Sequence, residues 1–396
     1  MSKIQCFQCG SSNFMKLIDL GKQPWCNDYQ LKKVNTYNLK VNFCLNCQGS
    51  QLSYFLKKEK MFSNNYYLSG DNPELINHFQ KISSSIKKKF PSDKKNKRNI
   101  LDIGSNDGTF LKNFKYGWNI LGIDPSKTAH KIANKKNIKT IKSYFNYESA
   151  VKINKEFDVI HASGVFFHLE DLFSCLKGVK ILLKKKGYFV VQFIYLKDLI
   201  FRNQFDQIYH EHLYYFTLKS IGHLMSRFDL EIIDVKKNSI HGGSVILTAG
   251  HKGINRQSIN VKKFFKKEKK NENLLLKKAK NFKNKIKSIK KNLLNKVNYL
   301  KKNNYKIYIL GAPAKATTAI NYFKLNSDVI ECCYDINRFK INKNVPGTNI
   351  KILNENRIKK IGSKDIFLIM SWNYKYIIIK KFKKKFGKAF KYFLPY

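Results

Sequence analysis

The chain has 396 residues, of which 43% are apolar, so it can bury a large core and its length predicts two or three domains. Its formal net charge is +49, but only six of the 76 basic residues are arginines, the side chain that binds phosphate best. A scattered lysine excess is typical of solvated surface. The start of the sequence lacks a signal-peptide pattern, and its apolar runs are short. We therefore expect a cytoplasmic protein with no nucleic-acid partner and no membrane association.

Residues 1–65 contain two pairs of closely spaced cysteines. Cys6 and Cys9 form one CxxC knuckle, and Cys44 and Cys47 form another. Two such knuckles supply the four thiolates of a tetrahedral structural zinc site, whose coordination is closed to substrates. The sequence therefore predicts an N-terminal zinc-binding domain that serves folding. The other cysteines lack this spacing and are expected to be buried side chains: Cys26, Cys175, Cys332 and Cys333.

Residues 66–250 alternate strand-like and helix-like patterns. Apolar strands are predicted at 100–103, 120–123, 157–160 and 188–193. Such alternation is typical of βαβ units and of a mostly parallel sheet covered by helices. We predict an α/β domain with a Rossmann-like sheet.

The first of these strands ends in a glycine-containing turn, residues 99–111, that leads into a helix. Gly104 and Gly108 would let a ligand approach the backbone, and Asp124, about twenty residues on, could accept the hydroxyls of a ribose. A dinucleotide would place its phosphates beside Asp102 and Asp107, which is unfavourable. S-adenosylmethionine (SAM) has no phosphate, so we favour SAM over a dinucleotide or an unliganded turn. The predicted cofactor-binding residues are Asp102, Gly104, Ser105, Asn106, Asp107, Gly108, Asp124 and Pro125, and residues 161–163 could border the adenine.

Acidic side chains, two imidazoles and several phenols lie together in the segment 205–216, just beyond a core strand. Imidazole is the side chain best suited to accept a proton at neutral pH, although a HxH pair could also bind metal and the tyrosines could be core aromatics. His168, after the fourth strand, and His241, in a HisGlyGlySer segment, are further candidates for chemistry. Either of these two histidines could instead be a hydrogen-bonded core residue.

Residues 251–304 predict a connecting helix, and residues 305–396 a second, small Rossmann-like domain. In the connecting segment, apolar residues at steps of three and four share one helix face: Leu275, Ala279, Phe282, Ile286, Ile289, Leu293, Val297 and Leu300. From Tyr305 a second βαβ pattern begins, with strand-like runs near 308–315, 329–335 and 366–373.

These motifs resemble, in order and over essentially the whole chain, the zinc-binding SAM-dependent C-methyltransferases that act on nucleotide-linked 4-keto deoxysugars. The resemblance implies an α/β protein with a class I SAM-methyltransferase domain at 66–250, an N-terminal zinc-binding domain and a C-terminal Rossmann-like domain. The segments that carry it include CysPheGlnCys, CysLeuAsnCys, LeuAspIleGlySerAsnAspGly, TyrHisGluHis, HisGlyGlySer, GlyAlaProAlaLys, ValProGlyThr and SerTrpAsnTyr.

The resemblance also implies which residues surround the sugar carbon: Tyr67, His168, Tyr209, Glu211 and His212. Tyr66 competes with Tyr67 for the first position. In this interpretation His212 is the base that forms an enolate, Tyr209 and Glu211 orient it or the ketone, and His168 or Tyr67 donates to the enolate oxygen. The zinc domain would form one wall of the cleft, and Lys315 would hold the nucleotide diphosphate.

Two positions depart from the family's common pattern. They bear on the substitution pattern of the expected sugar more than on the type of reaction. Gly164 stands where an Asn is common, and Gln192 where a Glu is common. Two other functions stay open on the sequence alone. One is an O- or N-methyltransferase acting on a sugar or small molecule, and the other is an RNA-binding or RNA-modifying zinc protein.

Overall fold

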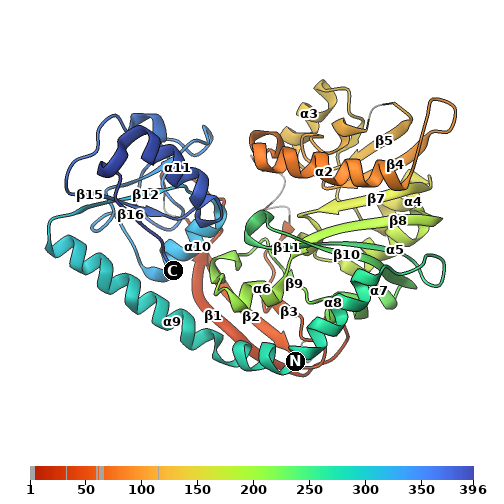
Figure 1. Cartoon of the computed structure of the whole chain (residues 1–396), viewed down its shortest axis with the longest axis horizontal. Coiled ribbons are helices and arrows are strands. Elements are labelled where there is room, and N and C mark those ends of the chain that lie inside the picture. The colour runs from red at the N-terminus through yellow and green to blue at the C-terminus, as the bar shows by residue number, and fades with distance from the viewer. Residues whose placement is uncertain (1–4, 33, 59–60, 62–66, 115) are drawn as a thin grey trace.

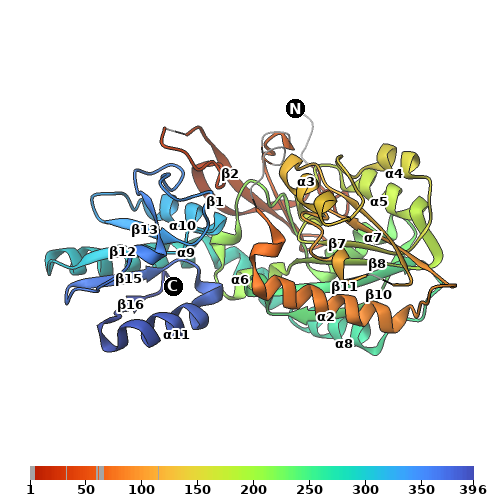
Figure 2. The same cartoon turned by 90° about the horizontal axis from the view of Figure 1, so that it is seen from above.

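The computed structural model describes residues 5–32, 34–58, 61, 67–114 and 116–396. The described residues form three sheets, and Figure 1 shows two α/β units side by side with the first strands of the chain between them. Figure 2, a view from above, shows the same separation of the C-terminal unit from the larger central one.

The N-terminal sheet is antiparallel and has the strand order β1-β2-β3-β9. Strand β2 alternates side chains, with Leu39, Val41 and Phe43 buried, which is the pattern of a sheet with one covered face. Strand β9 comes from the middle of the chain, so the sheet of the zinc domain is completed by the central domain. The strands are β1 (Phe14–Pro24), β2 (Thr36–Cys44), β3 (Ser50–Leu52) and β9 (Tyr214–Tyr215).

The central sheet has seven strands in the order β10-β11-β8-β7-β4-β5-β6, and only β11 runs antiparallel to its neighbours. This is the strand order of the class I methyltransferase fold, and the predicted βαβ strands lie in it. Its strands are β4 (Arg98–Ile103), β5 (Trp118–Ile123), β6 (Thr140–Ile141), β7 (Phe157–Ser163), β8 (Leu183–Ile194), β10 (Leu230–Asn238) and β11 (Ser244–His251).

Helices cover both faces of this sheet, because its central strands are apolar on both sides. Residues Ile100, Leu101, Val159 and Ile160 are 0% exposed. The helices of this domain are α2 (Pro73–Lys89), α3 (Lys127–Lys135), α4 (Tyr147–Ile153), α5 (Leu172–Leu182), α6 (Leu196–Phe201) and α7 (Leu218–Ser226).

The connecting segment forms two helices, α8 (Ile259–Lys270) and α9 (Glu272–Lys302), where one helix was expected. The break falls at Asn271, whose side-chain amide donates to the carbonyl of Lys267 and so caps the end of α8. Just before the break, buried Glu268 accepts from the backbone amides of Leu218 and Lys219, which fixes α8 against α7. The predicted apolar face of α9 is buried, with Ile289 partly so.

The C-terminal sheet is parallel and has the order β14-β13-β12-β15-β16, which is a small Rossmann-like arrangement. Its elements are β12 (Lys306–Leu310), α10 (Ala314–Phe323), β13 (Cys332–Asp335), β14 (Ile352–Asn354), β15 (Asp365–Ile369), α11 (Lys375–Phe386) and β16 (Tyr392–Phe393). Helix α9 runs beneath this unit and ties it to the rest of the chain (Figure 1). Among the described residues, none of the helices combines the length and the apolar character that a bilayer crossing requires.

Candidate active site and zinc centre

The four cysteines of the two knuckles meet in one cluster. The sulfur of Cys6 lies 3.7 Å from that of Cys47, and the sulfur of Cys9 lies 3.7 Å from that of Cys44. All four sulfurs lie within 4.8 Å of one another. A tetrahedral zinc with Zn–S bonds of about 2.3 Å requires S–S separations of about 3.8 Å. The donor set and its spacing therefore fit one structural zinc ion.

A cavity of about 440 Å³ is lined by residues of all three domains. Parallel strands bind ligands beyond their carboxyl ends, and this cavity opens beyond the ends of β4, β5 and β7. Many of the predicted site residues line it: Tyr67, Gly104, Asn106, Asp124, Pro125, His168, Tyr209, Glu211 and His212. Residues of the zinc domain and of the C-terminal domain complete its walls.

Asp124, at the end of β5, is fixed in the cofactor crevice by two backbone amides. The amide of Asn106 donates to its Oδ2 at 2.9 Å, and the amide of Ser126 donates to its Oδ1 at 2.8 Å. Burial raises the pKa of Asp124 to about 6, so the carboxylate is mostly ionised at neutral pH. Each oxygen keeps a further lone pair, which suits a carboxylate that accepts from both hydroxyls of a ribose.

The crevice has further features of a nucleoside site. Residues 143–146 also line the cavity, and this stretch includes the rings of Tyr144 and Phe145. Aromatic rings beside a ribose-binding carboxylate suit the adenosyl part of SAM, so the residues present fit this cofactor.

Four of the predicted cofactor residues lie behind the cavity wall: Asp102, Ser105, Asp107 and Gly108. Asp102 is buried and pairs with Nδ1 of His161 at 2.7 Å, and the His161 ring stacks on Phe110 with a centroid distance of 3.7 Å. Asp107 pairs with Lys136 at 2.9 Å. Neither carboxylate lines the cavity, nor do Ser105 and Gly108. A Cβ at Gly108 would meet the Ile138 side chain at 2.5 Å, so this glycine permits close packing.

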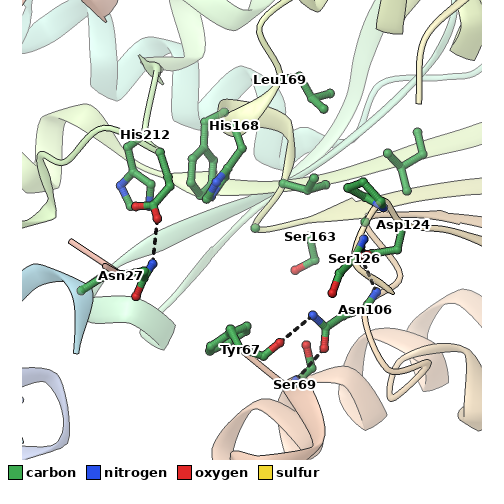
Figure 3. A pocket seen from close by; sticks show the side chains of 18 of the residues that line it. Asn27, Tyr67, Ser69, Asn106, Asp124, Ser126, Ser163, His168, Leu169 and His212 are labelled. Carbon is green, nitrogen blue, oxygen red and sulfur yellow. Dashed lines mark hydrogen bonds between the residues drawn. The ribbon is translucent and has the colours of Figure 1, made fainter. Parts of the chain in front are cut away.

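Asn106 joins the cofactor loop to the segment that carries Tyr67. Its Oδ1 accepts from the amide of Ser69 at 2.9 Å, and its Nδ2 donates to the carbonyl of Tyr67 at 3.0 Å. Its φ of +50° lies in the left-handed region, which Asn adopts more readily than most residues. Figure 3 shows Asn106 between Asp124 on one side and Tyr67 and Ser69 on the other. The competing Tyr66 lies outside the described residues.

His212 is held with a defined tautomer at the other end of the cavity. Its Nδ1 lies 2.7 Å from the carbonyl oxygen of Gln207. Because a carbonyl can only accept, Nδ1 carries the hydrogen, and the neutral ring keeps its lone pair on Nε2. The ring lies 3.8 Å from that of Tyr209 and 5.1 Å from that of His168, measured between centroids. His212 therefore has the electronic form that a general base needs.

Glu211 is buried beside this histidine and accepts three hydrogen bonds from the zinc domain. Trp25 Nε1 donates to its Oε1 at 2.6 Å, Asn27 Nδ2 donates to the same oxygen at 2.7 Å, and the Cys26 thiol donates to Oε2 at 2.8 Å. Burial raises the pKa of Glu211, and the three donors oppose that shift. Figure 3 shows Asn27 below His212, with the bond to the carboxylate dashed. The sequence did not predict this contact.

Gln192 binds Ser163, a residue that lines the cavity. Its Oε1 accepts from the hydroxyl of Ser163 at 2.7 Å and lies 2.6 Å from Nε2 of His78, while its Nε2 donates to Ser244 at 3.2 Å. Because Ser163 donates its proton to Gln192, its oxygen can accept from a ligand in the cavity. Gly164, the other departure from the family pattern, has φ of +68° and open space where a Cβ would be.

The C-terminal domain supplies a cationic wall. Lys315, near the start of α10, is buried, lies 4.0 Å above the Trp372 ring and donates to Asn373. Burial lowers the pKa of Lys315 to about 8, and the nearby Asp206 carboxylate partly opposes this. Asp206 accepts from Trp372 and Tyr396 at 2.6 and 2.5 Å.

His241 was a further candidate, but its side chain lies outside the described part of the structure. Its backbone belongs to a short turn, Ile240–Gly242. At Gly242 in that turn, a Cβ would meet the Trp372 ring at 2.3 Å, so the glycine allows the C-terminal domain to pack closely here.

Three family models match consecutive parts of the chain. They are described as "Putative zinc binding domain" for residues 6–62, "Methyltransferase domain" for residues 75–235 and "C-methyltransferase C-terminal domain" for residues 239–395. Together they span nearly the whole sequence.

Curated relatives and solved structures are similar to this chain to different extents. The C-methyltransferase NovU of Streptomyces niveus is 25% identical over 401 aligned residues, which cover 99% of this chain and 95% of NovU. A release factor glutamine methyltransferase of Buchnera aphidicola is 24% identical over 253 residues, covering 59% of this chain and 84% of that protein. Magnesium protoporphyrin IX methyltransferase (ChlM) of Synechocystis PCC 6803, solved with bound SAM, covers 45% of this chain and 81% of its own, at 13% identity and a TM-score of 0.34.

The strand order, the Asp124 crevice and the methyltransferase domain match define a SAM-dependent methyltransferase. Three further observations point to a C-methyltransferase with a zinc-binding domain. They are the cysteine cluster, the match to the C-terminal domain model and the full-length similarity to NovU. The chain is a SAM-dependent methyltransferase whose N-terminal and C-terminal parts match the models of a zinc-binding domain and of a C-methyltransferase C-terminal domain.

Proposed function

We propose that this enzyme methylates a carbon atom next to the ketone of a nucleotide-linked keto sugar. The observation that supports this most directly is His212, a buried imidazole whose tautomer leaves Nε2 able to accept a proton, in the same cavity as the Asp124 crevice. A carbon acid needs such a base before it can accept a methyl group.

The cofactor would be held at the β4–β5 end of this cavity. Asp124 would accept from the ribose hydroxyls, the backbone of Gly104 and Asn106 would face the amino-acid part, and Tyr144 and Phe145 would border the adenine. When bound, SAM supplies the methyl carbon as an electrophile on a sulfonium. The chain's own residues then have to place the substrate carbon and remove its proton.

In the proposed step, Nε2 of His212 takes the proton from the carbon beside the ketone. The C–H bond breaks, an N–H bond forms, and the electron pair moves into the enolate, whose oxygen gains negative charge. Tyr67 and His168 both line the cavity and can donate to that oxygen. Glu211, as a neighbouring carboxylate, favours the protonated form of His212.

The C-terminal wall supports a substrate that carries phosphate. Lys315, in α10, and Lys340 both line the cavity. A diphosphate placed there would extend the sugar toward His212 and His168. The zinc domain contributes Asn27 to the same cavity, while its closed four-sulfur site serves folding.

The test is a screen of nucleotide-linked keto sugars with SAM, read by mass gain, followed by NMR of the product. The proposal expects a new methyl signal coupled to a carbon skeleton, with the ketone retained. A methyl group on oxygen or nitrogen would contradict it. Methylation of RNA without any mass gain on the sugars would favour the nucleic-acid alternative.

A further inference from the structure

Three consecutive residues of the zinc domain enclose one catalytic carboxylate. Trp25, Cys26 and Asn27 donate an indole N–H, a thiol and an amide N–H to Glu211, over distances of 2.6 to 2.8 Å. All three donors are neutral groups. Among the described residues, the ion pairs that the structure forms do not include Glu211. These three residues are hereafter the 25–27 clamp.

The clamp favours the ionised form of the carboxylate and so opposes the effect of burial, which raises the pKa of Glu211. A protonated carboxyl must itself donate one hydrogen bond, whereas an ionised one is acceptor-only. Both oxygens of Glu211 face donors, so the arrangement suits the ionised form. Glu211 is only 3% exposed, and an ionised carboxylate at such a site needs hydrogen bonds to offset its lost hydration.

The clamp is itself held from two sides. It follows directly after β1, which pairs with β2 from Phe14 opposite Cys44 to Pro24 opposite Thr36. One end of this ladder therefore lies at the cysteine cluster and the other at the clamp. On the opposite side, the Thr317 hydroxyl in α10 donates to the carbonyl of Cys26 at 3.2 Å. The clamp is fixed by the zinc domain and the C-terminal domain together.

We infer that Trp25, Cys26 and Asn27 are positioning residues that hold Glu211 as an ionised carboxylate beside His212, and so support the base in its protonated form. This rests on the proposed role of His212. The titratable groups that interact with Glu211 are Cys26 from the clamp and Tyr209 from its own segment, and His212 is the next residue in the chain. Lys340 of the C-terminal domain faces Cys26.

The inference predicts a particular change in the pH profile. Trp25→Phe keeps the ring but removes one donor, so Glu211 should take up its proton at higher pH. The midpoint of the acid limb of the kcat/KM profile should move to higher pH by about one unit. At a fixed pH on that limb, kcat/KM should therefore fall by about tenfold or more. Asn27→Ala should shift the limb in the same direction, and SAM affinity should stay near that of the wild type.

Two controls separate this from a structural effect. Trp118→Phe is a matched change, because the indole N–H of Trp118 is buried without a hydrogen-bond partner in the described structure; its acid limb should stay in place. In a Glu211→Gln background, Trp25→Phe should shift nothing further. An unmoved acid limb in Trp25→Phe, or the same shift in both backgrounds, would overturn the inference.

An infrared titration tests the clamp without substrate. The carboxyl band that disappears in Glu211→Gln belongs to protonated Glu211, and it should titrate at higher pH in Trp25→Phe and in Asn27→Ala. This result would stand even if the product carried its methyl on oxygen, so failure of the proposed function and failure of the inference are distinguishable. A band with the same titration midpoint in all three proteins would contradict the clamp.

Discussion

The central sheet and the C-terminal sheet each hold a carboxylate in the same local geometry. Asp124 accepts from the amides of Asn106 and Ser126, and Asp335, at the end of β13, accepts from the amides of Ala312 and Asn337. Only Asp124 lines the cavity. In the central sheet the carboxylate itself reaches the cavity, whereas in the C-terminal sheet only the turn and the start of α10, with Lys315, reach it.

The difference lies in what faces each turn. In the C-terminal sheet, the Tyr29 hydroxyl and the Lys340 ammonium both donate to the carbonyl of Ala312, at 2.7 and 2.8 Å, so a residue of the zinc domain packs onto this turn. In the central sheet, the equivalent space is the cofactor crevice. Local geometry therefore does not decide whether the carboxylate at such a turn meets a ligand, because the surroundings differ between the two sheets.

The largest expected effect comes from removing the zinc site, because the zinc domain contacts both the central domain and the C-terminal domain. Structural zinc contributes on the order of 10 kcal/mol to folding. Replacing Cys6, Cys9, Cys44 and Cys47 together by Ser should abolish bound zinc and lower the unfolding temperature sharply. Metal analysis and calorimetry check this, and full folding of the quadruple variant without zinc would contradict it.

A matched pair of substitutions tests the two carboxylates. Asp124→Ala should weaken SAM binding by about 1 to 3 kcal/mol, since a charged acceptor for the ribose is lost. Asp335→Ala removes the equivalent hydrogen bonds outside the cavity, so it should lower thermal stability and leave SAM affinity near that of the wild type. Titration calorimetry with SAM measures the affinity of both variants. Equal losses of affinity would contradict the claim that only Asp124 meets the cofactor.

The cationic wall gives a pH prediction. Because burial lowers the pKa of Lys315 to about 8, this ammonium is charged below that pH and loses its proton as the pH rises through it. The KM for a diphosphate-linked sugar should therefore rise by up to about tenfold between pH 7 and 9. Lys315→Met should show a high KM without this dependence. A pH-independent KM in the wild type would exclude a phosphate contact at Lys315.

A smaller effect is expected at Asn106, which links the cofactor loop to the Tyr67 segment. Asn106→Gly keeps the left-handed backbone but removes two hydrogen bonds, worth about 1 kcal/mol each. We expect turnover to fall several-fold while SAM affinity, which depends on the backbone amide at this position, changes little. If SAM affinity fell as much as turnover, the Asn106 side chain would also support the cofactor site, which would contradict a role confined to the Tyr67 segment.

The periodic parts of the fold could be predicted from the sequence. The central strands, the second βαβ unit and the buried face of α9 follow from apolar spacing, and the cysteine cluster follows from its two knuckles. The break at Asn271 and the pairing of β9 with the zinc sheet did not follow, because both depend on contacts with distant segments.

The site could be predicted only in part. The motifs bring the reactive residues and Asp124 to one cavity, but Asp102 and Asp107 lie behind its wall, where His161 and Lys136 bind them. The 25–27 clamp lies about 185 residues from Glu211 in the sequence, and a single sequence contains no signal for a contact over that distance. Cys26 was expected to be buried, which it is, but its thiol also donates to the carboxylate.

The most direct test of the central claim is proton exchange at the substrate carbon. With the demethylated product of SAM in place of SAM, the wild-type enzyme should wash deuterium from solvent into the carbon beside the ketone, as followed by NMR. His212→Asn keeps similar bulk but cannot accept a proton at neutral pH. Exchange and methylation should therefore fall together by about 10² to 10⁴, with SAM binding retained. Methylation at near the wild-type rate in His212→Asn would contradict the account.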